Sequence, residues 1–311
     1  MQCYSPLKGY KDPETGGIKF RRDGSPDSVK MEVRCGQCLG CRLHRSNVWM
    51  ARIMHEASLY LDNCFVTLTY RERADCTREE LKNGWYVPED GSLRKKDFQK
   101  FMKRLRKRFA GSKVRYYQCG EYGEKLQRPH HHACLFNFDF SDKELFQDND
   151  GVLLFTSKIL EELWPYGFCT VGELTPESAA YTARYVMKKV TGHSAEDHYL
   201  RFDENGCAYW LEPEYVTMSR RPGIGKDWYE KYKDDMFPSD LMPVPGREPV
   251  RGVPRFYEEK FAEEYPEIVE EMKRIRRAFQ VAHGEEYTAD RLMQKYKVKK
   301  RQVEMLRRSM A

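Results

Sequence analysis

The 311-residue sequence has no run of about 18 consecutive apolar residues, the length that a membrane-spanning helix needs. This absence excludes a protein built on transmembrane helices, and we expect no membrane partner. The opening residues, MQCYSPLKGY, lack a basic segment followed by an apolar one, so we expect no secretory signal. A phosphate-binding G-x-x-x-x-G-K-[ST] loop is also missing, because GIGK at 223–226 is too short, and this excludes an evident ATPase.

Positive charge is modest in total but concentrated in two segments. The net charge is +6, yet residues 94–108 hold nine Lys and Arg against one acid, and residues 291–308 hold eight against one. The rest of the chain is therefore net negative. This pattern favours a polyanionic partner at defined faces, although two solvated helix faces would give the same composition.

The ten cysteines are unevenly spaced. Without a secretory signal we expect a reducing compartment, where clustered thiols bind metal or stay free. Cys35, Cys38 and Cys41 form C-x2-C-x2-C, and Cys3 completes four thiolates suited to tetrahedral Zn²⁺. His44 is an alternative fourth ligand, an iron–sulfur cluster uses similar spacing, and buried free thiols are the alternative to any metal. The remaining six are expected to pack in the core: Cys64, Cys76, Cys119, Cys134, Cys169 and Cys207.

Hydrophobic periodicity predicts an α+β protein. Helical spacing of apolar residues predicts helices at 42–61, 96–109, 156–164 and 177–190, and β-branched and aromatic runs predict strands at 64–70, 114–123, 130–138 and 168–175. The second and third strands are expected to pair as a hairpin across EKLQRP, in an antiparallel sheet flanked by helices. Prolines from 238 to 254 predict an irregular connector, and charged helices follow from 256 to the end.

Three consecutive histidines lie on the third predicted strand. Side chains alternate along a strand, so His130 and His132 share one face and His131 has the other. Hairpin pairing brings Glu121 beside them, and an oxygen ligand favours Mg²⁺ or Mn²⁺ over structural zinc. The alternative is three histidines at a solvated strand end.

The helix predicted at 177–190 combines paired tyrosines with cations. Tyr181 and Tyr185 are four residues apart and share one face, together with Arg184, Lys188 and Lys189 on the same helix. Two tyrosines at this spacing are usually core aromatics, but cations suited to phosphate weaken that interpretation.

Together, the histidine edge and the tyrosine helix describe a site for phosphodiester cleavage. A tyrosine hydroxyl has a pKa of about 10, so only about one in a thousand is ionised at pH 7. A divalent ion on His130, His132 and Glu121 would polarise the phosphate, and Lys188 would steady the developing charge. The product would be a 5′-phosphotyrosyl intermediate and a free 3′-OH.

At this point the sequence resembles a known family. FVTLTY, GEYGEKLQRPHHHACLF and AAYTARYVMKK follow, in this order, the three motifs of HUH replication initiators. With CGQCLGCRLHRS and MSRRPGIG, the chain resembles the replication initiation proteins of gokushoviruses, small single-stranded DNA phages of the Microviridae, over roughly residues 1–255. The resemblance implies an HUH-endonuclease-like fold and a site-specific endonuclease and ligase that nicks the viral-strand origin and starts rolling-circle replication.

Site residues carry over by position. His130 and His132 match the motif histidines, while His131 stands where a hydrophobic residue is usual and is an alternative ligand. Tyr181 and Tyr185 match the tyrosine motif, and two nucleophiles would let one hold the old 5′ end while the other cuts the next copy. The tyrosines follow the histidines, which favours a Rep-type order over that of relaxases.

The expected organisation is a Cys-rich element and helix at 1–60, a nicking-joining catalytic domain at 61–230, and a Pro-rich connector with a basic helical tail at 231–311. Single-stranded origin DNA is expected along 94–108 as partner, with a host helicase and DNA polymerase, in the cytoplasm of the bacterial host cell. Three tyrosines are expected either to stack bases or to pack: Tyr116, Tyr117 and Tyr122. The alternatives are a non-catalytic zinc-stabilised DNA-binding protein and an HUH transposase.

Overall fold

The computed structural model describes residues 2–12, 15–20, 29–123, 126–184, 190 and 194–305. The chain divides into two compact units. We call them the terminal unit, made of residues 1–45 and 265–308, and the sheet unit, centred on residues 46–264. No helix in the described ranges is long and apolar enough to cross a membrane.

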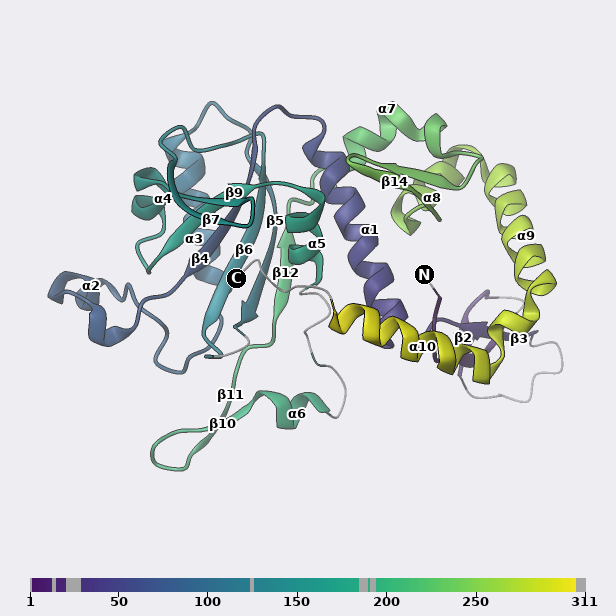
Figure 1. Cartoon of the computed structure of the whole chain (residues 1–311), viewed down its shortest axis with the longest axis horizontal. Helices are drawn as coiled ribbons and strands as arrows, with labels where there is room; N and C mark the ends of the chain where they lie inside the picture. The colour runs from purple at the N-terminus through teal and green to yellow at the C-terminus, as the bar shows by residue number, and fades with distance from the viewer. Residues whose placement is uncertain are drawn as a thin grey trace. The chain divides into compact units, whose positions relative to one another are not determined.

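The sheet unit holds most of the regular structure, and the boundary between the units falls within its first helix (Figure 1). In chain order, its elements are α1 (Leu39–Ala57), β4 (Asn63–Thr69), α2 (Arg78–Asn83), α3 (Lys95–Arg108), β5 (Arg115–Tyr122), β6 (Pro129–Phe136), β7 (Glu144–Asn149), β8 (Val152–Thr156), α4 (Lys158–Leu163), β9 (Cys169–Glu173), α5 (Pro176–Arg184), α6 (Ser194–Tyr199), β10 (Leu200–Phe202), β11 (Ala208–Trp210), β12 (Tyr215–Met218), α7 (Lys226–Met236), β13 (Leu241–Val244), β14 (Arg247–Arg251) and α8 (Arg255–Glu264).

A seven-stranded antiparallel sheet forms the centre of this unit. Its strand order is β12-β5-β6-β4-β9-β8-β7. Strands β5 and β6 pair from Arg115 opposite Phe136 to Tyr122 opposite Pro129, so the predicted hairpin is confirmed. The expectation of an α+β chain with an antiparallel sheet flanked by helices is confirmed as well.

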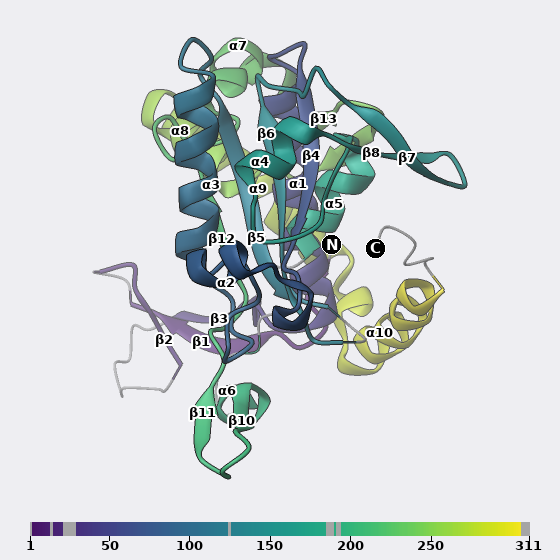
Figure 2. The same cartoon turned by 90° about the vertical axis from the view of Figure 1, so that its left-hand side faces the viewer.

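Helices cover both faces of the sheet, and the alternation of side chains along β4 decides what each face carries (Figures 1 and 2). Val66 and Leu68 point to the face that α3 and α4 cover, where Phe101 and Trp164 complete a large apolar core. We call this the α3 face. The other, which we call the α5 face, contacts α5 and the second part of α1, for example through Trp49 and Tyr117, whose ring centroids are 5.1 Å apart.

Two hairpins differ from the sequence-based expectation. β7 and β8 were not predicted, because β7 is an exposed edge strand whose side chains show no alternation of burial. The stretch predicted as an irregular connector contains the end of α7 and the hairpin β13–β14. Pro243 and Pro249 lie within these two strands, and a two-stranded hairpin tolerates proline because each strand has an unpaired edge.

The six cysteines outside the C-x2-C-x2-C segment do not all pack. Cys64, Cys119, Cys134 and Cys169 are buried as expected. Cys76 is half-buried and Cys207 is exposed, so the expectation was wrong for Cys207. Cys207 follows Gly206 in the turn between β10 and β11, where its N–H donates to Asp203.

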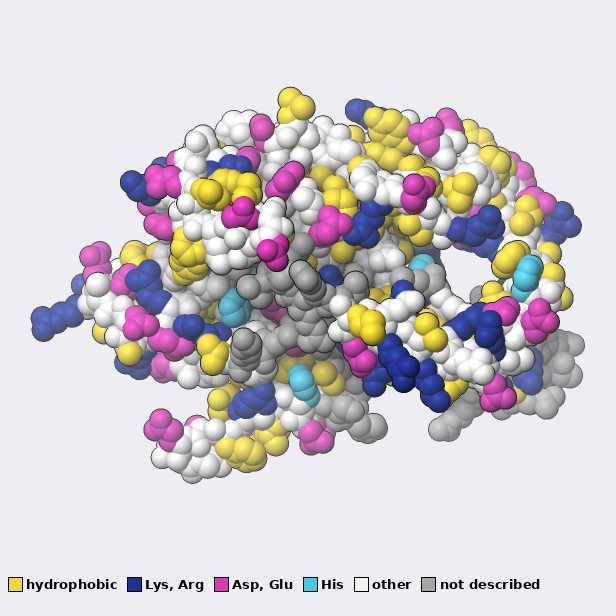
Figure 3. Space-filling model, in the orientation of Figure 1, with side chains coloured by type: hydrophobic (Ala, Val, Ile, Leu, Met, Phe, Trp, Pro, Cys, Tyr) yellow, Lys and Arg dark blue, Asp and Glu magenta, His cyan; other side chains and the backbone are white. Residues whose placement is uncertain are grey.

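The terminal unit combines a small sheet with helices. Its elements include β1 (Leu7–Lys11), β2 (Ile18–Lys19), β3 (Val29–Val33), α9 (Pro266–Ala282) and α10 (Ala289–Glu304), and its strand order is β2-β1-β3. The prediction of charged helices after residue 256 is confirmed. Lys and Arg side chains gather along α10 (Figure 3), although Arg291 and Lys295 both pair with Glu286.

Candidate active site and metal centre

The candidate active site lies on the α5 face, at one end of β5 and β6. The register places Glu121 opposite His130, and Thr67 of β4 opposite His132. Cross-strand partners share a face, so the two histidines and Glu121 form one row of polar groups, as the strand alternation predicts.

His132 is held from both sides. Its Nε2 lies 2.8 Å from Glu121 Oε1, and its Nδ1 lies 3.1 Å from the Thr67 hydroxyl oxygen. His132 and Glu121 are 4% and 3% exposed, so this contact is shielded from water. Because a carboxylate and an imidazole nitrogen face each other here, these two atoms are the ones that a shared divalent ion would bind.

His130 offers its second ring nitrogen. Its Nδ1 donates to the Arg128 carbonyl oxygen at 2.7 Å, which fixes the tautomer and leaves Nε2 as a potential ligand. Its ring is nearly parallel to that of His132, with centroids 6.4 Å apart. Burial and the neighbouring His132 lower the pKa of His130, so the imidazole stays neutral, the form that binds metals. The donor set fits Mg²⁺ or Mn²⁺, with the histidines adding nitrogen ligands that suit Mn²⁺ better.

His131 is part of the core on the α3 face. Its Nε2 lies 3.0 Å from the Tyr70 hydroxyl oxygen, and its Nδ1 lies 3.2 Å from Gln118 Nε2 and 3.3 Å from the Tyr215 hydroxyl oxygen. It is fully buried, and burial lowers the pKa of His131 to about 3. The alternative of His131 as a ligand beside His132 is therefore not supported.

Helix α5 brings Tyr181 to the histidines. The ring of Tyr181 stands edge-on to His132, with centroids 5.2 Å apart at 90°, and edge-on to Phe65 at 6.3 Å. The next residue, Thr182, contacts Cys134 of β6 at 3.6 Å and fixes the helix against the sheet. Tyr185 and Lys188, the other two residues expected to act in catalysis, lie outside the described residues.

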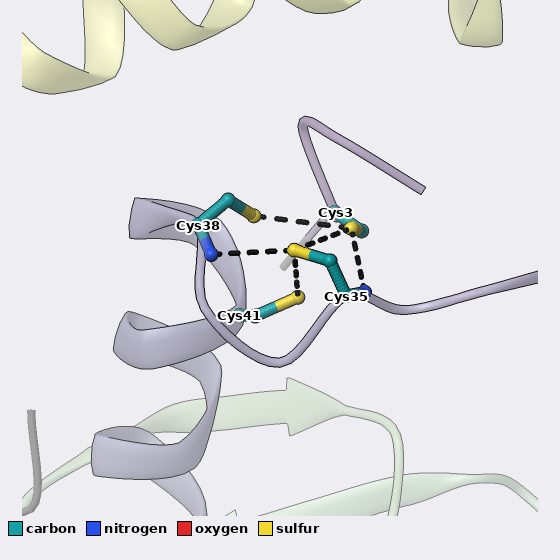
Figure 4. A group of neighbouring side chains, drawn as sticks. All are labelled: Cys3, Cys35, Cys38 and Cys41. Atoms are coloured by element: carbon teal, nitrogen blue, oxygen red, sulfur yellow. Dashed lines mark hydrogen bonds between the residues drawn. The ribbon is translucent and has the colours of Figure 1, made fainter. Parts of the chain in front are cut away.

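A second candidate centre is the cysteine cluster of the terminal unit (Figure 4). The Cys3 sulfur lies 3.6 Å from that of Cys35 and 3.8 Å from that of Cys38, and the sulfurs of Cys35 and Cys41 are 4.0 Å apart. Four ligands about 2.3 Å from one tetrahedral ion stand about 3.8 Å apart, so the spacing fits a single ion such as zinc. An iron–sulfur cluster would separate the thiolates further, because each binds a different iron.

In the part of the chain that the structure describes, these four cysteines are the one group of three or more His, Cys, Asp or Glu whose ligand atoms all lie within 4.8 Å of one another. His44 is not among them, so the structure assembles the four-cysteine set. The active-site row is more open than this cluster.

Backbone groups prepare the cluster for thiolates. Burial opposes ionisation of Cys38, but the N–H groups of Tyr4 and Cys41 and the neighbouring thiols outweigh it and lower the pKa of Cys38 to about 6. Burial raises the pKa of Cys3 to about 12. Gly40 lets the N-terminal segment approach, because a Cβ there would lie 2.0 Å from the Gln2 carbonyl oxygen.

The predicted DNA track lies mainly on the other side of the sheet. Helix α3 packs on the α3 face, and three of its arginines bind protein groups: Arg104 the Leu163 carbonyl, Arg106 the Val114 carbonyl and Arg108 the Glu162 carboxylate. Its lysines remain exposed. The beginning of α3 lies near the active-site end of the sheet, where Lys95 stands 4.9 Å from the Tyr215 ring centroid.

Phe168 is a candidate site residue that was not predicted from the sequence. Its carbonyl accepts from Thr69, which lies opposite His130, so Phe168 continues the row of the α5 face two strands away, at about 10 Å. Phe168 is 48% exposed and lies 5.2 Å from the exposed ring of Phe146. By contrast, Tyr117 and Tyr122 are buried and pack in the core. No signal in the sequence separates an exposed phenylalanine at a strand end from a core one.

Comparisons with known proteins agree with this placement. Residues 63–190, from β4 to beyond α5, match the family of the replication-associated protein ORF2. The chain is 31% identical over 278 residues to "Replication-associated protein VP4" of Bdellovibrio phage phiMH2K, covering 86% of this chain and 79% of that protein. It is 31% identical over 282 residues to "Replication-associated protein ORF2" of Spiroplasma virus 4, covering 85% and 82%. A further relative is "Replication-associated protein ORF4" of Chlamydia phage 1, 28% identical over 160 residues, or 50% and 38% of the two chains. No solved structure matches.

Proposed function

The chain belongs to the gokushovirus-type family of phage replication-associated proteins, and we propose that it nicks and rejoins single-stranded origin DNA as an HUH endonuclease. In this proposal it initiates and terminates rolling-circle replication of a small phage inside its bacterial host. The observation that carries the proposal is the meeting of Tyr181 with His132 and Glu121 on one face of the sheet.

His130, His132 and Glu121 would hold a Mg²⁺ or Mn²⁺ ion. Such an ion supplies Lewis acidity, which draws charge from the phosphate and stabilises the pentacoordinate state. The carbonyl of Arg128 and the hydroxyl of Thr67 orient the two imidazoles, so the ligand nitrogens keep their direction while the substrate exchanges.

The tyrosine oxygen attacks the phosphorus, and the bond from phosphorus to the 3′ oxygen breaks. The tyrosine hydroxyl loses its proton, and the leaving 3′ oxygen gains one and becomes a free 3′-OH. One phosphodiester bond replaces another, so attack by a 3′-OH can reverse the step and join the strand. We assign the nucleophile to Tyr181 and Tyr185 and the steadying of charge to Lys188.

The substrate strand would reach the site from the beginning of α3, where exposed lysines attract phosphates, and pass along the α5 face. Phe168 and Phe146 offer an exposed aromatic platform in the same row as His130. Single-stranded DNA commonly stacks its bases on such rings.

Replacing Phe168 with alanine should weaken binding of a single-stranded origin oligonucleotide about 5- to 150-fold, since stacking on one ring contributes about 1–3 kcal/mol per base. Fluorescence anisotropy measures this. Phe202→Ala is the matched control, because Phe202 is 64% exposed and lies on β10, away from the seven-stranded sheet. Equal affinities of the Phe168 variant and wild type would rule the platform out.

The remaining parts of the chain have supporting roles in this proposal. Residues 61–230 act as the catalytic domain, residues 1–60 carry a structural zinc on Cys3, Cys35, Cys38 and Cys41, and residues 231–311 form the C-terminal part. Because the chain has no phosphate-binding ATPase loop, a host helicase would unwind the DNA and a host polymerase would extend the 3′-OH.

The function is tested with a labelled single-stranded oligonucleotide that contains the origin of the cognate phage. With Mn²⁺, we expect one cut whose 3′ end a polymerase can extend, no cut after chelation of the metal, and no cut in a scrambled sequence. Tight, specific binding without any cut under these conditions would instead support the zinc-stabilised DNA-binding protein.

A further inference from the structure

The segment SRRPGIG, residues 219–225, forms a turn between β12 and α7 that the proposed chemistry does not use. Ser219 ends the pairing with β5: its N–H donates to the Tyr116 carbonyl at 2.9 Å, and its hydroxyl oxygen accepts from the Tyr116 N–H at 3.1 Å. Two arginines follow, Arg220 and Arg221, and both are exposed.

Buried charged groups fix the conformation of this turn. Arg115 donates to the carbonyls of Pro222 at 3.0 Å and Gly223 at 3.4 Å, and Arg52 donates twice to the carbonyl of Ile224, at 3.1 and 2.8 Å. Three consecutive carbonyls are thus capped by guanidinium groups that are 3% and 8% exposed.

Glu56 completes the network. It is fully buried, pairs with Arg115 at 2.5 Å, and accepts from the Gly225 N–H at 2.7 Å. Arg52 in turn lies between two aromatic rings, 4.4 Å from the centroid of Trp49 and 4.1 Å from that of Phe256. Burying charges is costly and rarely the most stable solution for a core. This arrangement therefore favours a need for one fixed turn geometry over a need for stability.

The two arginines that the turn presents are available to a ligand. Within the described ranges, neither guanidinium group makes a hydrogen bond or ion pair, unlike most of the arginines in the sheet unit that the structure describes. The two side chains line a shallow hollow of about 460 Å³. The charged groups nearest in sequence are Lys226, which pairs with Glu230 at 3.9 Å, and the exposed Asp227.

We propose that Arg220 and Arg221 bind phosphate groups of the origin DNA outside the cleavage position, and this rests on the proposed function. A guanidinium group matches two phosphate oxygens, and a rigid turn reduces the entropy lost on binding. Ser219 bonds to Tyr116, five residues before Glu121 on β5, so the turn lies at least about 17 Å from the active site along the strand. At about 3.4 Å per nucleotide, that distance corresponds to about five nucleotides of stacked DNA.

The experiment compares Arg220→Ala/Arg221→Ala with wild type on two origin DNAs: a short oligonucleotide that fills only the active site, and the same sequence with flanks of about ten nucleotides, single-stranded or duplex. Affinity is measured by anisotropy over a range of salt concentrations. We expect at least about tenfold weaker binding of a flanked DNA at low salt and a salt slope reduced by about 1.4–1.8, the loss of two phosphate contacts. Binding and nicking of the short oligonucleotide should be unchanged, which also shows that the variant is folded.

The matched control is Arg251→Ala/Arg255→Ala, which removes the same charge from exposed positions of the sheet unit. Equal losses for both double variants, or an equal loss on short and flanked DNA, would overturn the proposal. Its failure is distinct from that of the proposed function: wild type that binds flanked DNA through the turn but never cuts it disproves only the nicking chemistry.

Discussion

We expect the His130→Ala/His132→Ala variant to nick single-stranded origin DNA at least about a hundredfold more slowly than wild type. The two imidazoles and Glu121 are the groups that would hold the divalent ion, and Lewis-acid stabilisation is worth several kcal/mol, about tenfold in rate for each 1.4 kcal/mol. The rate is measured in single-turnover reactions with Mn²⁺ in excess, so that weaker substrate binding does not enter.

A milder variant separates chemistry from folding. Alanine at residue 132 removes the buried partner of Glu121, whereas His132→Gln keeps a donor for this carboxylate and is a poorer metal ligand. The glutamine variant should unfold near the wild-type temperature and still lose nicking. His198→Ala is the control, because His198 is exposed and lies on α6. Nicking at wild-type rates by the folded glutamine and alanine variants would remove these histidines from the site.

The second large effect concerns the cysteine cluster. We expect Cys35→Ser to reduce bound zinc from one ion per chain to almost none and to open the terminal unit to proteases, since structural zinc contributes about 10–16 kcal/mol in small domains. The measurement is elemental analysis of purified protein combined with limited proteolysis. Cys207→Ser is the control, because Cys207 is exposed and outside the cluster.

Gly40→Ala tests the same site without touching a ligand. The added Cβ would meet the Gln2 carbonyl oxygen at 2.0 Å and displace the segment that carries Cys3, so zinc should be lost to a chelator faster than from wild type. Full zinc retention by Cys35→Ser would contradict the four-cysteine centre.

Much of the central sheet could be predicted from sequence because its strands are buried on both sides. Residues 64–70 and 130–138 are apolar and β-branched runs, and their pairing follows from the short connection between β5 and β6. The same reasoning failed at the edges. β7 is solvated on both faces, and β13–β14 contains prolines that read as loop in isolation.

The candidate site was predictable to the extent that it depends on local geometry. Strand alternation separates His130 and His132 from His131, and register places Glu121 beside them. Long-range packing was not predictable: the meeting of Tyr181 with His132, the approach of Cys3 to Cys38, and the position of α3 on the opposite face depend on contacts between distant segments. The segment MSRRPGIG was recognised as a motif, but only the structure reveals that buried Arg52, Arg115 and Glu56 hold it.

The central claim is that a tyrosine of this chain attacks origin DNA, and the most direct measurement is a covalent adduct. Wild type, Tyr181→Phe/Tyr185→Phe and each single variant are incubated with Mn²⁺ and single-stranded origin DNA, separated on a denaturing gel, and the adduct is mapped by mass spectrometry. Phenylalanine keeps the ring that packs on His132 and removes only the hydroxyl. We predict an adduct of wild type mapped to residue 181 or 185 and none for the double variant. An adduct that persists in the double variant, or that maps to another residue, would contradict the account.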